Sequence, residues 1–378
     1  MQVAEDITSD TFIAAFETWS HKGIPENPTA WLYTVAKNKV KNHIARQRLF
    51  TEKIAKEIQA THSATEEIDI DWSDQHFFDS QLQMLFAICH PSISQESQIG
   101  LALRILCGFG INEIADAFLT NKETINKRLF RAREKLRAEK VPIEFPHESE
   151  IATRLDSVLA TLYLLFSEGY YSESQDSVLR KDLCLEAMRL TYMLIEYEKT
   201  DQPAVNALLA LMCFHSSRFE ARKDYNGELV LYDDQDESLW NYELIAKGAY
   251  FLNQASQGTT VSKYHIEAGI AYWHTVKTDS IEKWSAILKL HNQLLMAEYS
   301  PIAALNRTYA LAKVKGKEAA IAEAEKLQLY DNHFYFTLLG ELYKGIDDKK
   351  AKENFIRAKE LAKTRADKHI IQKNIDTL

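Results

Sequence analysis

The clearest candidate for chemistry in this sequence is a run of cationic side chains within residues 120–137. Seven lysines and arginines stand there against two glutamates, which gives +5 on one helix of a protein whose net charge is −9. Ile125, Leu129, Ala132 and Leu136 recur at spacings of four, three and four, so one face of this helix is apolar. The helix can therefore pack by one face and offer the other to nucleic acid.

A shorter helix is expected immediately before this basic helix. Apolar residues recur between Ile111 and Phe118 at helical spacing. The run Thr120-Asn121-Lys122-Glu123 fits a capping box, with Thr120 as the cap. Two short helices with a capped turn between them predict a helix-turn-helix whose second helix enters a DNA major groove. The alternative is a helix of a bundle whose charged face only meets water.

A second basic helix is expected over residues 29–48. It carries five lysines and arginines and no acidic residue. Trp31, Tyr33 and Asn38 stand among these cations, and such a mixture suits a surface that holds phosphates and stacks unpaired bases. A packed helix with a solvated face fits the same pattern, so both interpretations stay open on these residues alone.

The composition favours an all-α fold of several units. The chain has 378 residues but only 12 glycines and 7 prolines, which favours helices over a β-rich sandwich or barrel. Residues 51–80 carry eight acidic side chains against Lys53 and Lys56, and this net charge of −6 predicts an acidic linker. We expect four parts: residues 1–50, a linker at 51–76, residues 77–146 around the basic helix, and a helical extension at 147–378.

The extension shows a repeat near its end. Residues 301–327 and 333–362 each read as two helices around a glycine, with an offset of about thirty residues. This period approximates tetratricopeptide-like repeats, whose stacked hairpins bind proteins or peptides, while irregular helical hairpins are the alternative. Earlier in the extension, acidic residues cluster at 233–236. We expect Asp236 to cap a helix beside a buried Trp240, because no calcium-loop spacing accompanies the cluster.

The remaining patterns do not indicate an enzyme. The four cysteines are scattered without close pairs, so neither a disulfide framework nor a zinc site is expected. Phosphate-binding glycine loops, hydrolase nucleophile motifs and spaced histidine ligands do not occur, so we expect no cofactor and no metal. No apolar run is long enough to cross a bilayer and no secretory leader opens the chain. These features predict a cytoplasmic protein without a membrane partner.

Three segments in order, residues 4–19, 27–48 and 111–137, resemble the two conserved domains of a bacterial extracytoplasmic-function sigma factor of group IV, in the sigma-70 family. Residues 90–109, 162–170, 208–218, 227–241 and 300–312 resemble the subgroup with a long C-terminal tetratricopeptide-like extension. The resemblance implies region 2-like helices in residues 1–50 and a region 4-like helix-turn-helix in residues 77–146. It also implies that the protein directs RNA polymerase to specific promoters.

The resemblance assigns residues to each contact. The residues implied to lie against the clamp of core RNA polymerase are Glu5, Asp6, Asp10, Phe12 and Phe16. The residues implied to melt and read the −10 promoter element are Asn27, Trp31, Tyr33, Lys37, Asn38, Lys41 and Arg46. The residues of the basic helix implied to bind the −35 element are Lys122, Glu123, Thr124, Asn126, Lys127, Arg128, Arg131 and Arg133. The polymerase flap is a second implied contact, and the extension is expected to modulate activity or to bind a protein partner.

The chain departs from the family pattern at its start. Another helix normally precedes the segment at 4–19, whereas this chain begins three residues before it, so we expect the first sigma domain to be incomplete. The alternative function, from another class, is a helix-turn-helix regulator or a helical-repeat scaffold that acts without polymerase. Binding of duplex promoter DNA in the absence of core enzyme would favour that alternative.

Overall fold

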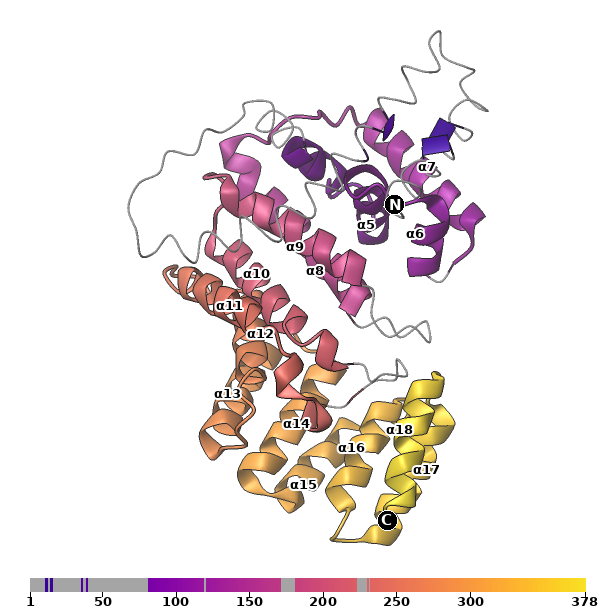
Figure 1. The fold of residues 1–378 in the computed structure, drawn as a ribbon, viewed down its shortest axis with the longest axis vertical. Coiled ribbons are helices and arrows are strands. Elements are labelled where there is room, and N and C mark those ends of the chain that lie inside the picture. The colour runs from indigo at the N-terminus through magenta and orange to yellow at the C-terminus, as the bar shows by residue number, and fades with distance from the viewer. Residues whose placement is uncertain are drawn as a thin grey trace.

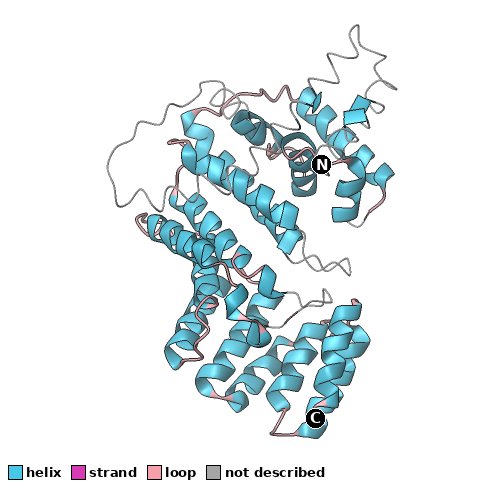
Figure 2. Cartoon of the chain, viewed as in Figure 1, coloured by secondary structure: helices cyan, strands magenta, loops and turns pink. Residues whose placement is uncertain are grey.

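The fold is seen in a computed structural model, which describes residues 11–12, 14–15, 35–36, 39, 81–118, 120–170, 181–222, 230 and 232–378. All regular elements within these ranges are helices, and no strand occurs among them (Figures 1 and 2). The predicted all-α class is therefore confirmed. The predicted linker at 51–76 and nearly all of residues 1–50 lie outside the described residues.

The predicted helix pair is present and follows a helix at 81–88. Helix α5 (Gln95–Leu101) continues into a π-helical segment, η3 (Ala102–Leu106). Helix α6 (Ile111–Ala117) and helix α7 (Lys122–Ala138) then contact each other. Ile125, Leu129 and Ala132 are buried, as the 4-3-4 spacing of the sequence predicts.

The cap of α7 differs from the prediction by one residue. The side chain of Asn121, not that of Thr120, accepts the hydrogen bond from the Thr124 backbone N–H, at 2.8 Å. The backbone N–H of Thr120 donates to the Ala115 carbonyl at 2.9 Å, so Thr120 still belongs to the turn that ends α6. Both side chains can cap a helix, and the length of that turn decides between them.

Five helices form the first part of the extension. They are α8 (Glu148–Tyr170), α9 (Lys181–Glu196), α10 (Pro203–Ser216), α11 (Tyr242–Ala255) and α12 (Lys263–Trp273). Helix α10 contacts the other four, and nearly all of its residues are buried. An apolar helix of this kind needs neighbours on every side, so α10 is the centre around which this part assembles.

Short helical turns connect α10 to α11. They are η4 (Glu220–Arg222), η5 (Tyr232–Asp234) and η6 (Glu237–Leu239). The Asp236 carboxylate accepts a hydrogen bond from the Ser238 backbone N–H at 2.9 Å, and Trp240 is buried. The predicted capping role of Asp236 is confirmed.

The last six helices form stacked antiparallel hairpins (Figure 1). They are α13 (Ile281–Ala297), α14 (Pro301–Lys315), α15 (Lys317–Leu327), α16 (His333–Tyr343), α17 (Asp348–Leu361) and α18 (Arg365–Asp376). The pairs α14–α15 and α16–α17 are the two predicted hairpins, and each turns at a glycine with positive φ, Gly316 or Gly345. Their assignment to the tetratricopeptide class stays a prediction.

One buried apolar cluster runs from Leu82 to Ala271 and includes residues of α5 to α12. A separate cluster, from Leu305 to Ile371, lies between the last five helices. Packing is therefore continuous across residue 146, while the domain limit predicted there stays a prediction. No helix in the described part of the chain combines the length and apolar character needed to cross a bilayer.

All four cysteines are buried, and no disulfide joins them. Burial raises the pKa of Cys89 and of Cys213 to about 12, and it also raises the pKa of Cys184. A thiolate is the reactive form of cysteine, so these three side chains serve as packing residues.

The contact between α10 and α11 depends on a glycine. A Cβ atom at Gly248 would lie 2.6 Å from the ring of Phe214, which is itself buried. We expect Gly248→Ala to lower the free energy of unfolding by about 1–2 kcal/mol, because this overlap outweighs the gain in helix propensity. Urea denaturation followed by tryptophan fluorescence measures the change. Gly269→Ala is the control, since its Cβ would meet only the flexible end of Leu290 at 3.2 Å. A Gly248→Ala protein as stable as the control would refute this packing.

Buried histidines in the extension make its stability depend on pH. His291 is 5% exposed, and burial lowers its pKa from 6.5 to about 4. Below pH 6.5 the unfolded chain binds a proton that the folded chain does not, so stability falls as the pH falls. Between pH 7 and pH 5 this residue alone should cost about 1–2 kcal/mol, and His291→Leu should reduce the loss by that amount. Urea titrations at both pH values measure it, with His147→Gln, at an exposed histidine, as the control. An unchanged pH dependence in His291→Leu would contradict the assignment.

Candidate nucleic-acid interface

Helix α7 presents a cationic face opposite its buried one. Six of the eight residues predicted to bind the −35 element are exposed: Lys122, Glu123, Asn126, Lys127, Arg131 and Arg133. Thr124 and Arg128 are half-buried. The structure therefore brings all eight onto one helix, with six of them open to an outside partner.

A groove of about 440 Å³ lies between α7 and the segment that leads into α5. Lysine and arginine residues of α7 line one wall, and three serines with one isoleucine line the other. The lining residues are Ser92, Ile93, Ser94, Ser97, Thr124, Lys127, Arg128, Arg131, Ala132 and Lys135. Cationic and hydroxyl side chains are the groups with which proteins hold nucleic acid phosphates. The groove therefore offers a binding position for a nucleic acid backbone beside the exposed face of α7.

The cations of α7 differ in how firmly they are engaged. Arg128 pairs with Glu96 on α5 at 3.0 Å and lies 5.5 Å from the ring centre of Phe118. It therefore bridges the two walls of the groove. Arg133 donates to the Leu129 carbonyl at 3.3 Å. Among the described residues no ion pair includes Lys127 or Arg131, so these two charges are available to an outside anion.

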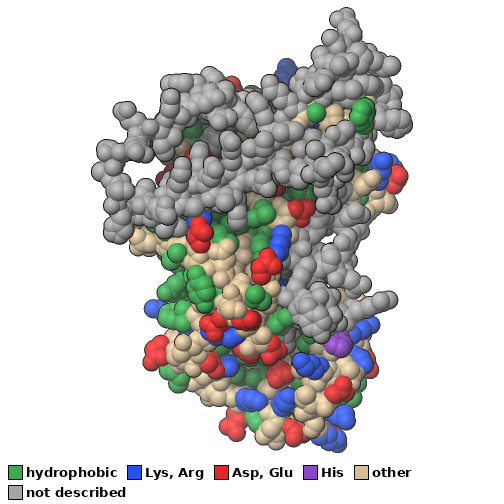
Figure 3. All heavy atoms as spheres, in the orientation of Figure 1, with side chains coloured by type: hydrophobic (Ala, Val, Ile, Leu, Met, Phe, Trp, Pro, Cys, Tyr) green, Lys and Arg blue, Asp and Glu red, His purple; other side chains and the backbone are tan. Residues whose placement is uncertain are grey.

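The charge pattern of α7 contrasts with that of the extension. On the face drawn in Figure 3, cationic and acidic side chains are intermixed over the C-terminal helices. Helix α7 instead concentrates lysine and arginine, and its glutamates are only Glu123 and Glu134. A concentration of one sign raises the local concentration of oppositely charged partners, and mixed charges do not.

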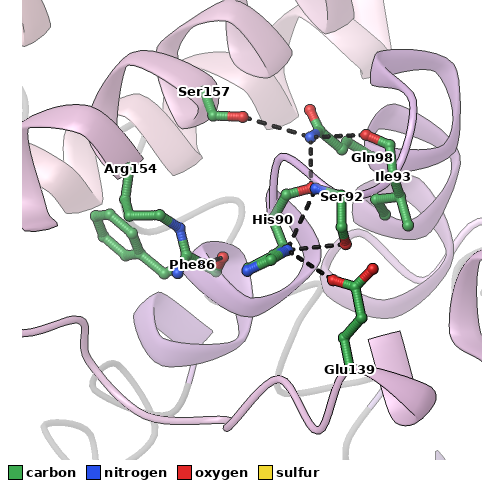
Figure 4. A network of polar contacts seen from close by, with 8 residues as sticks. All are labelled: Phe86, His90, Ser92, Ile93, Gln98, Glu139, Arg154 and Ser157. Atoms are coloured by element: carbon green, nitrogen blue, oxygen red, sulfur yellow. Dashed lines mark hydrogen bonds and ion pairs between the residues drawn. The ribbon is translucent and has the colours of Figure 1, made fainter. Parts of the chain in front are cut away.

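A buried glutamine connects this unit to the extension (Figure 4). The side-chain amide of Gln98 donates to the His90 carbonyl at 3.0 Å and lies 3.4 Å from the Ser157 hydroxyl on α8. The Thr161 hydroxyl, also on α8, donates to the Gln98 amide oxygen at 2.8 Å. Arg154 of the same helix donates to the Phe86 carbonyl at 2.5 Å. Helix α8 therefore holds in place the wall of the groove that contains the serines.

His90 belongs to the same network. Its Nδ1 lies 2.8 Å from the Ser92 hydroxyl and 3.8 Å from the Glu139 carboxylate, just beyond the end of α7 (Figure 4). Burial, followed by the charge of Arg154, lowers the pKa of His90. The imidazole is therefore mainly neutral near pH 7 and acts as a structural link between the two ends of this unit.

Sequence reasoning missed three features of this interface. Gln98 acts through Ser157 and Thr161, which lie far along the chain, and no local pattern marks Gln98 or the serines of the groove. Phe130 on α7 is 62% exposed. Its position four residues after Asn126 places both on one side of the helix. That apolar side chain could have been singled out, because it interrupts the charged face.

Of the residues predicted to bind the polymerase clamp and the −10 element, the structure describes one. Phe12 is the one described member of the clamp and −10 sets, and it is exposed. The predictions for the remaining members fall outside the described residues: Glu5, Asp6, Asp10, Phe16, Asn27, Trp31, Tyr33, Lys37, Asn38, Lys41 and Arg46. In the described ranges no group of histidine, cysteine and acidic side chains is arranged to hold a metal ion.

The Gln98 network makes a prediction about stability. Gln98→Leu keeps the size of the side chain but removes its donors and acceptor, so the Thr161 hydroxyl and the His90 carbonyl lose buried partners. We expect a loss of about 2–4 kcal/mol in the free energy of unfolding. Urea denaturation of the whole chain measures it. Gln95→Leu, at an exposed site on the same helix, is the matched control. Equal stability of the two variants would show that the network does not join the two parts.

Two family models match separate parts of the chain. Sigma-70 region 2 matches residues 2–50, and a family of unknown function, DUF6596, matches residues 154–256. The uncharacterized protein R00370 of Rhizobium meliloti (strain 1021) is 32% identical over 383 residues, with 100% of this chain and 90% of that protein covered. No solved structure matches the chain.

The region 2 match supports a sigma-factor-like role in promoter recognition, with core RNA polymerase and promoter DNA as partners. Sigma-70 factors are non-catalytic transcription factors. The chain belongs to the same family as the Rhizobium meliloti protein, and its sigma-70 region 2 segment supports a factor of the sigma-70 family.

Proposed function

We propose that the protein is an extracytoplasmic-function sigma factor of group IV, in which the α6–α7 pair is the helix-turn-helix that binds the −35 element. The observation that carries this proposal is the exposed cationic face of α7, beside a groove of cations and hydroxyls, in a chain whose N-terminal segment matches sigma-70 region 2. A cationic helix alone fits any DNA-binding protein, and the region 2 match adds the polymerase.

The residues of α7 divide into two groups by position. Lys122, Glu123, Asn126 and Lys127 lie on the first turns, where a recognition helix reaches base edges. Arg128, Arg131 and Arg133 lie further along and hold phosphates. Phe130 stands beside the first group and offers an apolar contact of the kind that meets a thymine methyl group. The backbone N–H of Thr124 donates to the Asn121 side chain, so Thr124 contributes by fixing the start of α7.

The −10 contacts belong to the N-terminal segment in this proposal. Residues 23–48 would melt and read the −10 element by stacking a base on an aromatic side chain and holding the backbone with lysine and arginine. Residues 5–16 would lie against the polymerase clamp, and the acidic segment at 51–76 would follow the basic path by which RNA leaves the enzyme. The match of sigma-70 region 2 to residues 2–50 supports this division. A protein with these partners acts in the cytoplasm.

The extension would modulate activity in cis. Helix α8 holds Gln98 and the segment at 86–90, which together support the serine wall of the groove. A change in α8 would therefore reach the DNA-binding face through a few hydrogen bonds. The hairpins from α13 to α18 offer a surface for a protein partner, as tetratricopeptide-like stacks do.

This packing also decides how the extension can be tested. Removal of residues 147–378 would strip α8 from the apolar cluster that it shares with α5 and α7. Loss of activity in such a truncated protein would then report unfolding. Point substitutions on α13 to α18, outside that cluster, test modulation without exposing the core.

The DNA contacts of α7 are tested by their salt dependence. We expect Lys127→Ala with Arg131→Ala to weaken promoter binding by the holoenzyme by about tenfold to hundredfold, and to reduce the slope of log affinity against log salt by about one, for the phosphate contact of Arg131. Holoenzyme made with core polymerase is titrated onto a duplex selected from random sequences by the wild-type holoenzyme. Lys349→Ala with Lys352→Ala, at exposed lysines of α17, is the matched control. An unchanged slope for the α7 variant would overturn the assignment, and wild-type binding without core would favour a polymerase-independent regulator.

A further inference from the structure

A cluster of cationic and aromatic side chains lies in the extension, partly inside the segment that matches the family of unknown function and partly beyond its end at residue 256. Three parts of the chain build it: the turn after α10, the segment from η5 to Trp240, and the loop from α12 into α13. We call it the Tyr232 cluster and define it by Arg218, Tyr232, Trp240, His274, Lys277 and Lys283.

Three cations surround one tyrosine ring. Their charged groups lie 5.2 Å (Arg218), 5.2 Å (Lys277) and 5.0 Å (Lys283) from the centre of the Tyr232 ring. Arg218 and Lys277 also lie 5.9 Å from the Trp240 ring. Each contact lies in the range of a cation–π attraction, but three like charges around one ring repel each other.

Lys247, the other buried cation in the described part of the extension, and the half-buried Arg189 each have a carboxylate partner, whereas the cations of this cluster form no ion pair. Arg189 pairs with Glu186 at 3.1 Å, and Lys247 pairs with Glu243 at 2.7 Å. No ion pair between described residues includes Arg218, Lys277 or Lys283. Asp279, the acidic group on the α12–α13 loop, instead pairs with Lys313 and accepts a hydrogen bond from Trp284. The charges of Asp233 and Asp279 act on Lys283 from a distance, but neither forms an ion pair with the cluster. Buried positive charge that is not closely paired is costly, so the cluster favours an anion.

Two buried donors of the cluster have no acceptor. Arg218 is 9% exposed and Trp240 is 4% exposed, yet Arg218 Nε and Trp240 Nε1 make no hydrogen bond. The lysines differ: Lys277 donates to the backbone carbonyls of residues 232, 233 and 235, and Lys283 donates to the Tyr232 hydroxyl and the Val276 carbonyl. The arginine and the tryptophan therefore hold the unsatisfied N–H groups.

We propose that the Tyr232 cluster binds a small molecule through an oxyanion, either a carboxylate or a phosphate group. Arg218 and Trp240 would donate hydrogen bonds to the oxyanion, and Lys277 and Lys283 would add positive potential. Planar guanidinium groups suit both oxyanions, because their parallel N–H bonds match the spacing of the oxygens. Tyr232, His274 and Lys277 are half-buried, so the cluster reaches solvent on one side.

The neutral members of the cluster fit this role. Burial lowers the pKa of His274 to about 3, with Arg218 and Lys283 as further causes, so this imidazole stays uncharged near pH 7. Its ring lies 5.3 Å from that of Tyr232, edge to face. A neutral imidazole adds no further repulsion and can donate or accept a hydrogen bond. The buried Gln235 amide oxygen, which also lacks a partner, could accept a hydrogen bond from a ligand hydroxyl.

Calorimetric titration and thermal unfolding of the whole chain test the proposal. One arm uses inorganic phosphate, a second uses acetate, and chloride keeps the ionic strength constant in both. We expect saturable heat and a saturable rise in Tm in at least one arm, and the stronger arm identifies the oxyanion. A response in neither arm, or one that chloride reproduces, would overturn the proposal.

Variants locate the binding. Arg218→Gln should weaken the binding at least about tenfold, and Trp240→Phe, which keeps the ring and loses the N–H, should weaken it several-fold. Arg357→Gln is the matched control, since Arg357 also lies over an aromatic ring, at 6.0 Å from Phe336, but already pairs with Glu360. If Arg218→Gln fails to fold, Arg218→Lys replaces it in the test, because lysine keeps the positive charge but lacks the two parallel N–H donors of arginine. The same loss of affinity is expected. Wild-type affinity in the folded Arg218 variant and in Trp240→Phe would overturn the assignment.

Discussion

The packing of α8 against the first helical unit is the constraint on which the rest of the structure depends. Leu155, Val158 and Leu162 of α8 belong to the same buried cluster as Leu85 and Ile99 of that unit. Apolar contact supplies most of the attraction, and the hydrogen bonds of Gln98 fix the register, because buried polar groups must find their partners. The cationic helix and helices α8 to α12 of the extension therefore share one core.

This constraint shapes what the cationic helix can do. The groove has one wall on α7 and another at the start of α5, and Arg128 joins the two through Glu96. Because α8 holds the α5 side, the spacing between the cations and the serines is set by the extension. A ligand or protein bound to the extension would have to act through this packing to change DNA binding. The extension thus has a physical route to the promoter-binding face, and regulation needs only a small shift along it.

Features of the fold could be predicted from the sequence where the residues that form them lie within a few positions of each other. The spacing of Ile125, Leu129 and Ala132 by four and then three residues predicted the buried face of α7. Asp236 was predicted as a cap, and its carboxylate accepts a hydrogen bond from the backbone N–H two residues later. The predicted cap of α7 was wrong by one residue. Two adjacent side chains can cap a helix, and the length of the preceding turn places Asn121 at the cap position.

Other features depend on contacts that no spacing in the sequence reveals. Gln98 follows the charged start of α5 as an ordinary polar residue, and its role comes from Ser157 and Thr161 on a helix about sixty positions later. The sequence around Arg218 likewise does not reveal its role, because its neighbours Tyr232 and Lys277 lie on two loops that approach it only in the fold. Phe130 shows the converse case, because an exposed aromatic side chain among the arginines of α7 could have been singled out from the sequence.

The proposed recruitment of RNA polymerase to promoters by this chain can be measured directly. Run-off transcription of fragmented genomic DNA by core polymerase, with and without the chain, is followed by sequencing of the 5′ ends. A second arm adds the helix that the family resemblance places before residue 4. If the chain acts as a sigma factor, we expect new, discrete start sites that share two conserved sequence blocks upstream. Start sites indistinguishable from those of core polymerase alone in both arms would contradict it.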